Sequence, residues 1–171
     1  MPVNAKKIKV PSAIPDLVAG FLSVGLIVVN IVVDVDEPLW LTISSLVCFG
    51  LALPFAALPF FHLAKYGEPK PGDAFYATMR VADRGIYSVV RHPQYLGYSL
   101  LVLGFAFLDP NLLSICLASG ALVFFYMQSI VEERFCETHL GSAYDAYKMR
   151  VPRMNFVLGV YRIATKRFSK T

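Results

Sequence analysis

Charged side chains are scarce in this sequence. Asp, Glu, Lys and Arg make up 16% of the 171 residues, whereas 56% of the residues are hydrophobic, and the mean hydropathy is +0.56. Such a composition is too apolar for an ordinary soluble domain of this length. It favours an integral membrane protein.

The sequence also lacks the usual signatures of metal and nucleotide sites. Its three cysteines, Cys48, Cys116 and Cys136, show no paired spacing, and no histidine cluster lies beside them. No glycine-rich loop follows a strand pattern, and no internal repeat is evident. We therefore expect no metal ion, no soluble nucleotide-binding domain, and a single membrane domain over residues 1–171.

Four apolar stretches account for most of the chain. Each of the longer ones can cross a hydrocarbon core of about 30 Å at about 1.5 Å per residue, and the third, which is short, joins the fourth through Asp109-Pro110 as a helical hairpin. The predicted spans are about 15–33, 39–63, 93–108 and 111–131. The sequence thus predicts an all-α integral membrane helical bundle of about four transmembrane helices, plus a cytoplasmic C-terminal amphipathic helix.

Basic residues are absent from two of the connections. All sixteen Lys and Arg lie before the first span, between the second and third, or after the fourth, whereas the other two connections hold only acids: Asp34, Asp36, Glu37 and Asp109. The positive-inside rule then places both termini and the middle loop in the cytoplasm. The net charge of +4 fits this topology and contact with anionic lipid head groups, and it does not indicate nucleic-acid binding.

The sequence pattern of the N-terminal segment does not indicate a cleavable signal peptide. Three lysines and two prolines precede the first apolar stretch, and no small-residue cleavage site closes it. Asp16 lies at the start of this stretch, where we expect it to cap the helix or to form an ion pair. The first span is therefore expected to remain in the mature protein.

The run "RHPQYLG" stands where the middle loop enters the third span. Pro93 suits the first turn of a helix, so Arg91 and His92 should lie at its N-terminal mouth. Free N–H groups, the helix dipole and Arg91 together favour an anion there. Tyr95 lies one turn inside, and Gly97 leaves room for a close approach. Taken singly, an arginine on lipid phosphate, an interfacial tyrosine and a packing glycine are ordinary membrane features.

Two adjacent acids, Glu132 and Glu133, follow the fourth span on the same side as Arg91. The C-terminal end of a helix disfavours negative charge, so these acids need a cationic partner. Arg91 or Arg134 would supply one as a structural ion pair, and a bound cation is the alternative. We expect residues 64–95 and 132–153 to form the cytoplasmic catalytic segments, around a pocket suited to a zwitterionic cofactor.

These motifs resemble a known family. "RHPQYLG", then "EERF" after a helical hairpin, then "GSAYDAYKMRVPR" is similar to the membrane-embedded methyltransferases that include isoprenylcysteine carboxyl methyltransferase and the phospholipid N-methyltransferases. The resemblance implies S-adenosylmethionine as cofactor. It also implies a cofactor site made of Arg91, His92, Tyr95, Gly97, Glu132 and Glu133. In this site His92 and Glu133 would be catalytic, and Glu133 would be the preferred cofactor contact.

The ending "YDAYKMRVPR" is similar to that of the isoprenylcysteine branch. Tyr144, Tyr147 and Arg150 recur every three residues, so they should lie along one side of a helix that Pro152 ends. The resemblance implies that all three bind substrate and that Arg150 acts in catalysis by neutralising a substrate carboxylate. The alternative is a basic residue on a membrane-surface helix. After Arg153 the chain departs from the family with "MNFVLGVYRIATKRF".

The expected function is S-adenosylmethionine-dependent methyl transfer, like that of isoprenylcysteine carboxyl methyltransferase, to a lipid-like or small membrane-partitioning acceptor. Carboxylate, amine and thiol acceptors stay open, as do the identity of any catalytic base and the oligomeric state. One alternative is a phospholipid (amine) N-methyltransferase. Others are a non-enzymatic membrane protein or transporter subunit on the same scaffold, and a membrane reductase.

Overall fold

The computed structural model describes residues 12–33, 36–67 and 80–168, and in them every regular element is helical. The elements are α1 (Ile14–Val32), α2 (Leu39–Tyr66), the 3₁₀ turn η1 (Gly85–Ser88), α3 (Pro93–Leu108), α4 (Leu112–Leu140), α5 (Ser142–Arg150) and α6 (Phe156–Phe168). The predicted all-α class is confirmed.

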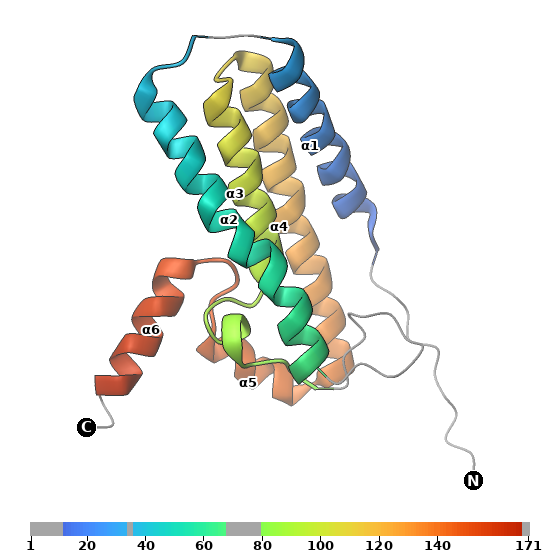
Figure 1. Cartoon of the computed structure of the whole chain (residues 1–171). Helices are drawn as coiled ribbons and strands as arrows, with labels where there is room; N and C mark the ends of the chain where they lie inside the picture. Colours follow the sequence, from blue (N-terminus) through green and yellow to red (C-terminus); the bar gives the residue numbers. More distant parts are fainter. Residues whose placement is uncertain (1–11, 34–35, 68–79, 169–171) are drawn as a thin grey trace.

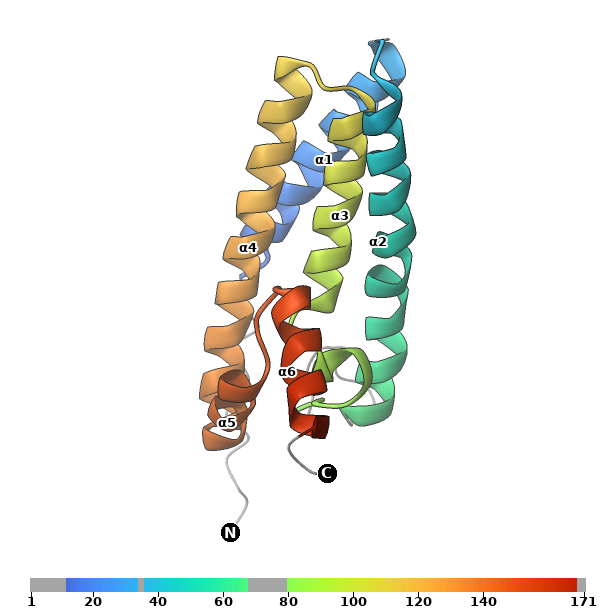
Figure 2. The ribbon, with the colours of Figure 1, turned by 90° about the vertical axis from the view of Figure 1, so that its left-hand side faces the viewer.

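Helices α1 to α4 lie side by side, with α3 between α2 and α4 (Figures 1 and 2). The end of α1, the start of α2 and the turn from α3 to α4 lie at one end of this bundle, and η1, α5 and α6 lie at the other (Figure 1). Three helices, α1, α2 and α4, are long and apolar enough to cross a bilayer, and α3 is a shorter apolar helix. The chain is therefore a multi-pass integral membrane protein.

Large apolar side chains cover the outside of the bundle. Phe21 and Ile31 on α1 are each 78% exposed, and Phe61 on α2 is 71% exposed. Inside, a core joins α1, α3 and α4 through Ala19, Leu26, Tyr95, Val102, Ala118, Ala121 and Phe125. Helices satisfy their own backbone hydrogen bonds, so such an apolar exterior suits a lipid surrounding.

Helices α2 and α3 approach closely because α3 carries glycines on the shared face. A Cβ added to Gly97 would lie 2.8 Å from the backbone nitrogen of Ala56 and 2.9 Å from the carbonyl carbon of Phe55. About two turns further along the interface, Gly104 packs against the ring of Phe49. The close approach expected at Gly97 is thus made by the backbone of α2, as at other membrane helix interfaces.

Sharp turns bring the C-terminal segments under the bundle. Asn111 caps α4 by accepting a hydrogen bond of 2.9 Å from the Ser114 N–H. At its other end α4 runs to Leu140, so the helix continues beyond the predicted membrane span of about 111–131. Gly141 then adopts a φ of 58°, which glycine tolerates at low cost, and α5 begins at once.

The predicted C-terminal helix, which carries Tyr144, Tyr147 and Arg150, corresponds to α5, and the further helix α6 was not predicted from the sequence. It lies beside η1 and the lower part of α2 (Figures 1 and 2). The ring of Phe156 meets that of Phe55 at a centroid distance of 5.3 Å, and Gly159 packs directly against the backbone of Val89. These contacts attach α6 to both α2 and the loop that precedes α3.

Replacing Gly97 with alanine should loosen the α2–α3 interface. The added methyl group meets backbone atoms, which cannot rotate away, so we expect a loss of about 1–3 kcal/mol, the usual range for overpacking. Gly50→Ala on α2 is the matched control, because a Cβ there meets nothing within 4 Å. Thermal unfolding in detergent measures both, and equal midpoints would contradict the close packing.

Candidate active site

A cavity of about 370 Å³ lies where the helix bundle meets η1 and α5. Its wall combines apolar side chains, such as Phe60 and Leu63 of α2, with an unusually polar set for a membrane protein. The polar part of the lining consists of Asp16, Tyr87, Arg91, His92, Gln94, Tyr95, Gln128, Glu132, Tyr144 and Tyr147. Every segment except α6 contributes to the wall.

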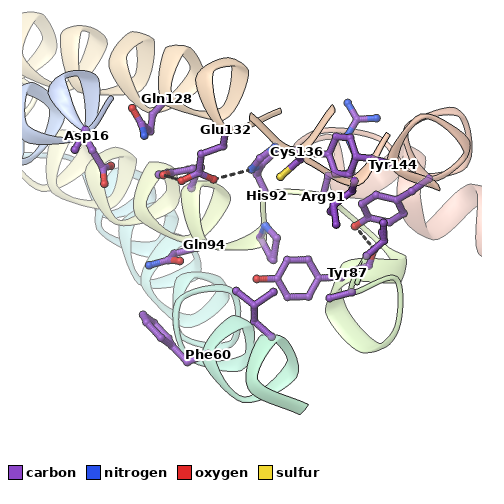
Figure 3. A pocket seen from close by; sticks show the side chains of 18 residues that line it. Asp16, Phe60, Tyr87, Arg91, His92, Gln94, Gln128, Glu132, Cys136 and Tyr144 are labelled. Atoms are coloured by element: carbon purple, nitrogen blue, oxygen red, sulfur yellow. Dashed lines mark hydrogen bonds and ion pairs between the residues drawn. The ribbon is translucent and has the colours of Figure 1, made fainter. Parts of the chain in front are cut away.

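Figure 3 shows how these side chains are distributed. Asp16, Gln128 and Glu132 lie toward one end of the cavity, where α1 and α4 approach α3. Tyr87 and Tyr144 lie toward the other end, near η1 and α5 (Figure 3). The acidic groups of the cavity are therefore gathered at the end nearest the apolar bundle.

The carboxylate of Glu133 is the centre of an ion-pair cluster behind this wall. Arg91 Nε donates to Glu133 Oε1 at 2.9 Å. Arg153 donates to both carboxylate oxygens, at 3.0 Å from Nε and 2.6 Å from NH2. The Glu133 side chain is 4% exposed and that of Arg91 is 9% exposed. Of the two partners considered from the sequence, Arg91 is the one that pairs with Glu133.

The segment before α3, which carries Arg91, and the segment after α5, which carries Arg153, are also joined through their backbones. The N–H of Arg91 donates to the carbonyl of Pro152 at 2.9 Å, and that of His92 donates to the carbonyl of Arg153 at 3.0 Å. The second guanidinium nitrogen of Arg91 donates to the carbonyls of Lys148 and Val151, at 2.8 and 2.9 Å. Arg91 therefore holds the end of α5 against the mouth of α3.

His92 lies between the two glutamates. Its Nε2 is 3.3 Å from Glu133 Oε1, and its Nδ1 is 3.6 Å from Glu132 Oε2. Burial alone lowers the pKa of His92, but the close contacts and negative charges of both glutamates outweigh it and raise the pKa above the ordinary 6.5. Glu132 also accepts a hydrogen bond of 2.6 Å from the Tyr95 hydroxyl. This bond fixes Glu132 on the cavity wall.

The predicted row of Tyr144, Tyr147 and Arg150 divides between inside and outside. Both tyrosines are buried and line the cavity, and Tyr147 donates to the carbonyl of Tyr87 at 2.7 Å. Arg150 is half exposed and lies 3.3 Å from Asp83, away from the cavity lining. The helix ends at Arg150, close to the predicted end at Pro152.

The structure therefore brings most of the predicted site residues to one cavity. Those on its wall are Arg91, His92, Tyr95, Glu132, Tyr144 and Tyr147. Glu133 lies directly behind the wall, whereas Gly97 and Arg150 lie outside it. The proposed roles of all these residues in binding and catalysis stay predictions.

Several residues of the cavity were not predicted. Gln128 was a readable signal, because a polar side chain within an apolar span is expensive unless it has a function. Arg153 belongs to the quoted ending but was not assigned. Asp16 was expected to cap α1 or to form an ion pair, but α1 has no side-chain cap, and none of the ion pairs among the described residues involves Asp16. Asp16 lies on the cavity wall instead.

Comparison with known protein families shows to which family the chain belongs. The model of the phospholipid methyltransferase family matches residues 40–143, which is more than half of the chain. The matched range holds the cavity-lining parts of α2, η1, α3 and α4. The fold and the match together define a membrane methyltransferase. The chain belongs to the phospholipid methyltransferase family, whose members use S-adenosylmethionine, and the family resemblance of the motifs is confirmed.

One relative has a more specific name. A protein-S-isoprenylcysteine O-methyltransferase of Schizosaccharomyces pombe is 39% identical over 69 residues, which cover 40% of this chain and 29% of the relative. The chain thus spans less than a third of the length of that relative. No solved structure matches the chain.

Removing the charge of Glu133 should destabilise the fold. Glu133→Gln leaves two guanidinium groups without their shared carboxylate, and breaking a buried pair in this way costs about 3–5 kcal/mol. Glu137→Gln is the control, since the Glu137–Lys148 pair is about one-third exposed and should contribute about 1 kcal/mol or less. Thermal unfolding in detergent compares them. An equal effect of both changes would remove Glu133 from its central role.

The stability of the protein should also depend on His92 and pH. Because the folded pKa of His92 is raised, its stabilising contribution is fully present below pH 6.5 and is lost as the pH rises through the folded pKa. The wild-type unfolding midpoint should therefore fall as the pH is raised from 6.5, and His92→Gln should flatten this fall. His139→Gln is the control, because His139 stacks on Phe135 and contacts neither glutamate of the cluster. A pH profile of His92→Gln identical to that of the wild type would contradict the assignment.

Proposed function

We propose that the cavity binds S-adenosylmethionine and that the protein transfers its methyl group to a lipid-like or small membrane-partitioning acceptor, in the manner of an isoprenylcysteine carboxyl methyltransferase-like enzyme. The observation that carries the proposal is the convergence of both family motifs on one polar cavity, at the end of a membrane bundle. When bound, this cofactor supplies an activated methyl group on a sulfonium.

The residues present fit such a ligand. The cavity of about 370 Å³ falls within the range of about 300–1,000 Å³ typical of small-molecule sites. Glu132 offers its carboxylate to a cationic group, and the Tyr95 hydroxyl holds that carboxylate on the cavity wall. The fixed acid suits a ligand that carries an ammonium and a sulfonium.

The chain's own residues would act mainly by positioning. Tyr95 holds Glu132 toward the cavity, and the Glu133 cluster fixes Arg91 and His92 beside it. Tyr144 and Tyr147 close the far end and keep water from the reacting groups. A methyl transfer to an anionic nucleophile needs little proton movement, so orientation and exclusion of water would supply most of the acceleration.

The acceptor is a separate question within this proposal. The name of the Schizosaccharomyces pombe relative suggests an isoprenylcysteine carboxylate, for which Arg150 would be the natural partner. A specific observation favours the amine alternative. Arg150 faces Asp83 outside the cavity, and both basic side chains on the wall, Arg91 and His92, already contact glutamates.

Glu132→Gln tests the cofactor site. Loss of one charge-assisted hydrogen bond should weaken S-adenosylmethionine binding by about 1.5–3 kcal/mol, with helical content preserved. Calorimetry in detergent measures the affinity, and Glu137→Gln serves as a control outside the cavity lining. Unchanged affinity in Glu132→Gln would show that the cofactor does not contact this carboxylate.

A methyl-transfer screen tests the reaction itself. The purified protein and cofactor labelled in the methyl group are offered a prenylcysteine, phosphatidylethanolamine and a small thiol in parallel. We expect label in at least one membrane-partitioning acceptor. Cofactor binding without transfer to any acceptor class would favour the non-enzymatic alternative.

A further inference from the structure

A second cavity of about 330 Å³ lies beside the first, between α1, α3 and α4. Its lining is almost wholly apolar, with side chains such as Leu26 from α1, Leu101 and Phe105 from α3, and Phe125 from α4. Asp16 is the residue that lines both cavities. A carboxylate therefore stands at the junction of a polar chamber and an apolar one.

The side chain of Asp16 has no hydrogen bond or ion pair with any other described residue, and it does not cap α1. It is half-buried in the first turn of the helix. The positive end of the helix dipole favours a negative charge at this place by about 0.3–1 kcal/mol. The Asp16 carboxylate thus lines both cavities as a hydrogen-bond acceptor, and no described residue donates a hydrogen bond to it.

Gln128 supplies an independent observation at the same end of the polar cavity. The residue is 3% exposed, and its carbonyl oxygen is buried without a hydrogen-bond partner among the described residues. Leaving such a group unpaired costs about 1–3 kcal/mol. Figure 3 shows Gln128 and Asp16 at the same end of the cavity. A ligand that brings N–H donors would satisfy both side chains.

The cationic side chains nearby are already committed. Arg91 and Arg153 both donate to Glu133, and His92 lies between Glu132 and Glu133. The junction of the cavities therefore presents hydrogen-bond acceptors and negative charge. An acidic head group would meet repulsion from Asp16, whereas an ammonium group would meet complementary charge.

We propose that Asp16 and Gln128 form the subsite for the nitrogen of an amine acceptor, whose hydrocarbon part lies in the second cavity. The inference rests on the methyltransferase function proposed above and assigns the acceptor class to that site. The hydrocarbon part is placed by the apolar lining, which offers nothing to the polar groups of the cofactor.

The chemistry balances with these groups. An ammonium first gives one proton to the Asp16 carboxylate, a transfer favoured by burial, which destabilises the separated charges. The nitrogen lone pair then forms the N–C bond to the methyl carbon while the C–S bond breaks. The electron pair of the C–S bond stays on sulfur, which becomes a neutral thioether. The product is a methylated ammonium, and the proton on Asp16 leaves to water.

A pair of matched probes tests the subsite without turnover. Dodecylamine and dodecanoate have equal chain lengths and opposite charges, and their binding to the full-length protein in uncharged detergent is measured by calorimetry. The wild type should bind the amine at least about tenfold more tightly, as expected for one charge-assisted contact. Asp16→Asn should abolish this preference while S-adenosylmethionine affinity stays within about twofold.

Two further variants sharpen the result. Asp83→Asn removes an acid that pairs with Arg150 outside the cavity, so it should keep the preference for the amine. Gln128→Met keeps the volume but removes the carbonyl acceptor, so it should weaken amine binding, and it tests the subsite independently if Asp16→Asn does not fold.

Several outcomes would overturn the subsite. Equal or tighter binding of dodecanoate by the wild type is one, and an unchanged preference in both Asp16→Asn and Gln128→Met is another. A loss of cofactor affinity in Asp16→Asn with amine binding unchanged would assign Asp16 to the ammonium of the cofactor instead. In each of these cases the wild type still binds S-adenosylmethionine, whereas a wild type that fails to bind it refutes the proposed function as well.

Discussion

The buried carboxylate of Glu133 is the interaction on which the cavity depends. It receives guanidinium groups from Arg91, before α3, and from Arg153, after α5. An acid near the end of a long helix is unfavourable by itself, since the helix dipole is negative there. The two arginines reverse that penalty, and in doing so they fasten the segment before α3 and the segment after α5 to α4. This cluster therefore supports the wall of the cavity where η1 and α5 meet the bundle.

Adjacent glutamates have different tasks because a helix rotates by about 100° per residue. Glu133 faces the two arginines, whereas Glu132 faces the cavity and accepts the Tyr95 hydroxyl bond. In the part of the chain that the structure describes, His92 is the residue that contacts both glutamates. The protonation state of one imidazole therefore links the structural cluster to the wall of the cavity.

The sequence was sufficient for the bundle. Apolar length dictates membrane helices, so α1 to α4 followed from hydropathy, and Pro93 predicted where α3 begins. The sequence did not predict α6, whose 13 residues mix apolar and basic side chains. It also ended the fourth span at the last apolar residue, whereas α4 continues to Leu140 because a helix does not stop where charge begins.

The site was predicted less completely than the bundle. Motif spacing led to six side chains of the cavity wall, but pairing between segments about twenty to sixty residues apart leaves no periodic signal. Arg153 was overlooked for that reason. The three-residue spacing of Tyr144, Tyr147 and Arg150 indicated one helix face, yet the last residue of a short helix turns outward to Asp83. Asp16 was expected to cap α1 or to form an ion pair, because an acid is favoured near the N-terminus of a helix.

The shortness of α3 has a consequence for the depth of the reaction. Its 16 residues extend about 24 Å, whereas the hydrocarbon core is about 30 Å thick. With the Asp109 end at one interface, the His92 end is recessed below the opposite head groups unless the bilayer thins around it. Under the proposed function, an acceptor with a lipid tail would reach the cavity without leaving the hydrocarbon, whereas a water-soluble donor would have to descend through the head-group layer. Bilayer thickness would then set how far apart the two reactants begin.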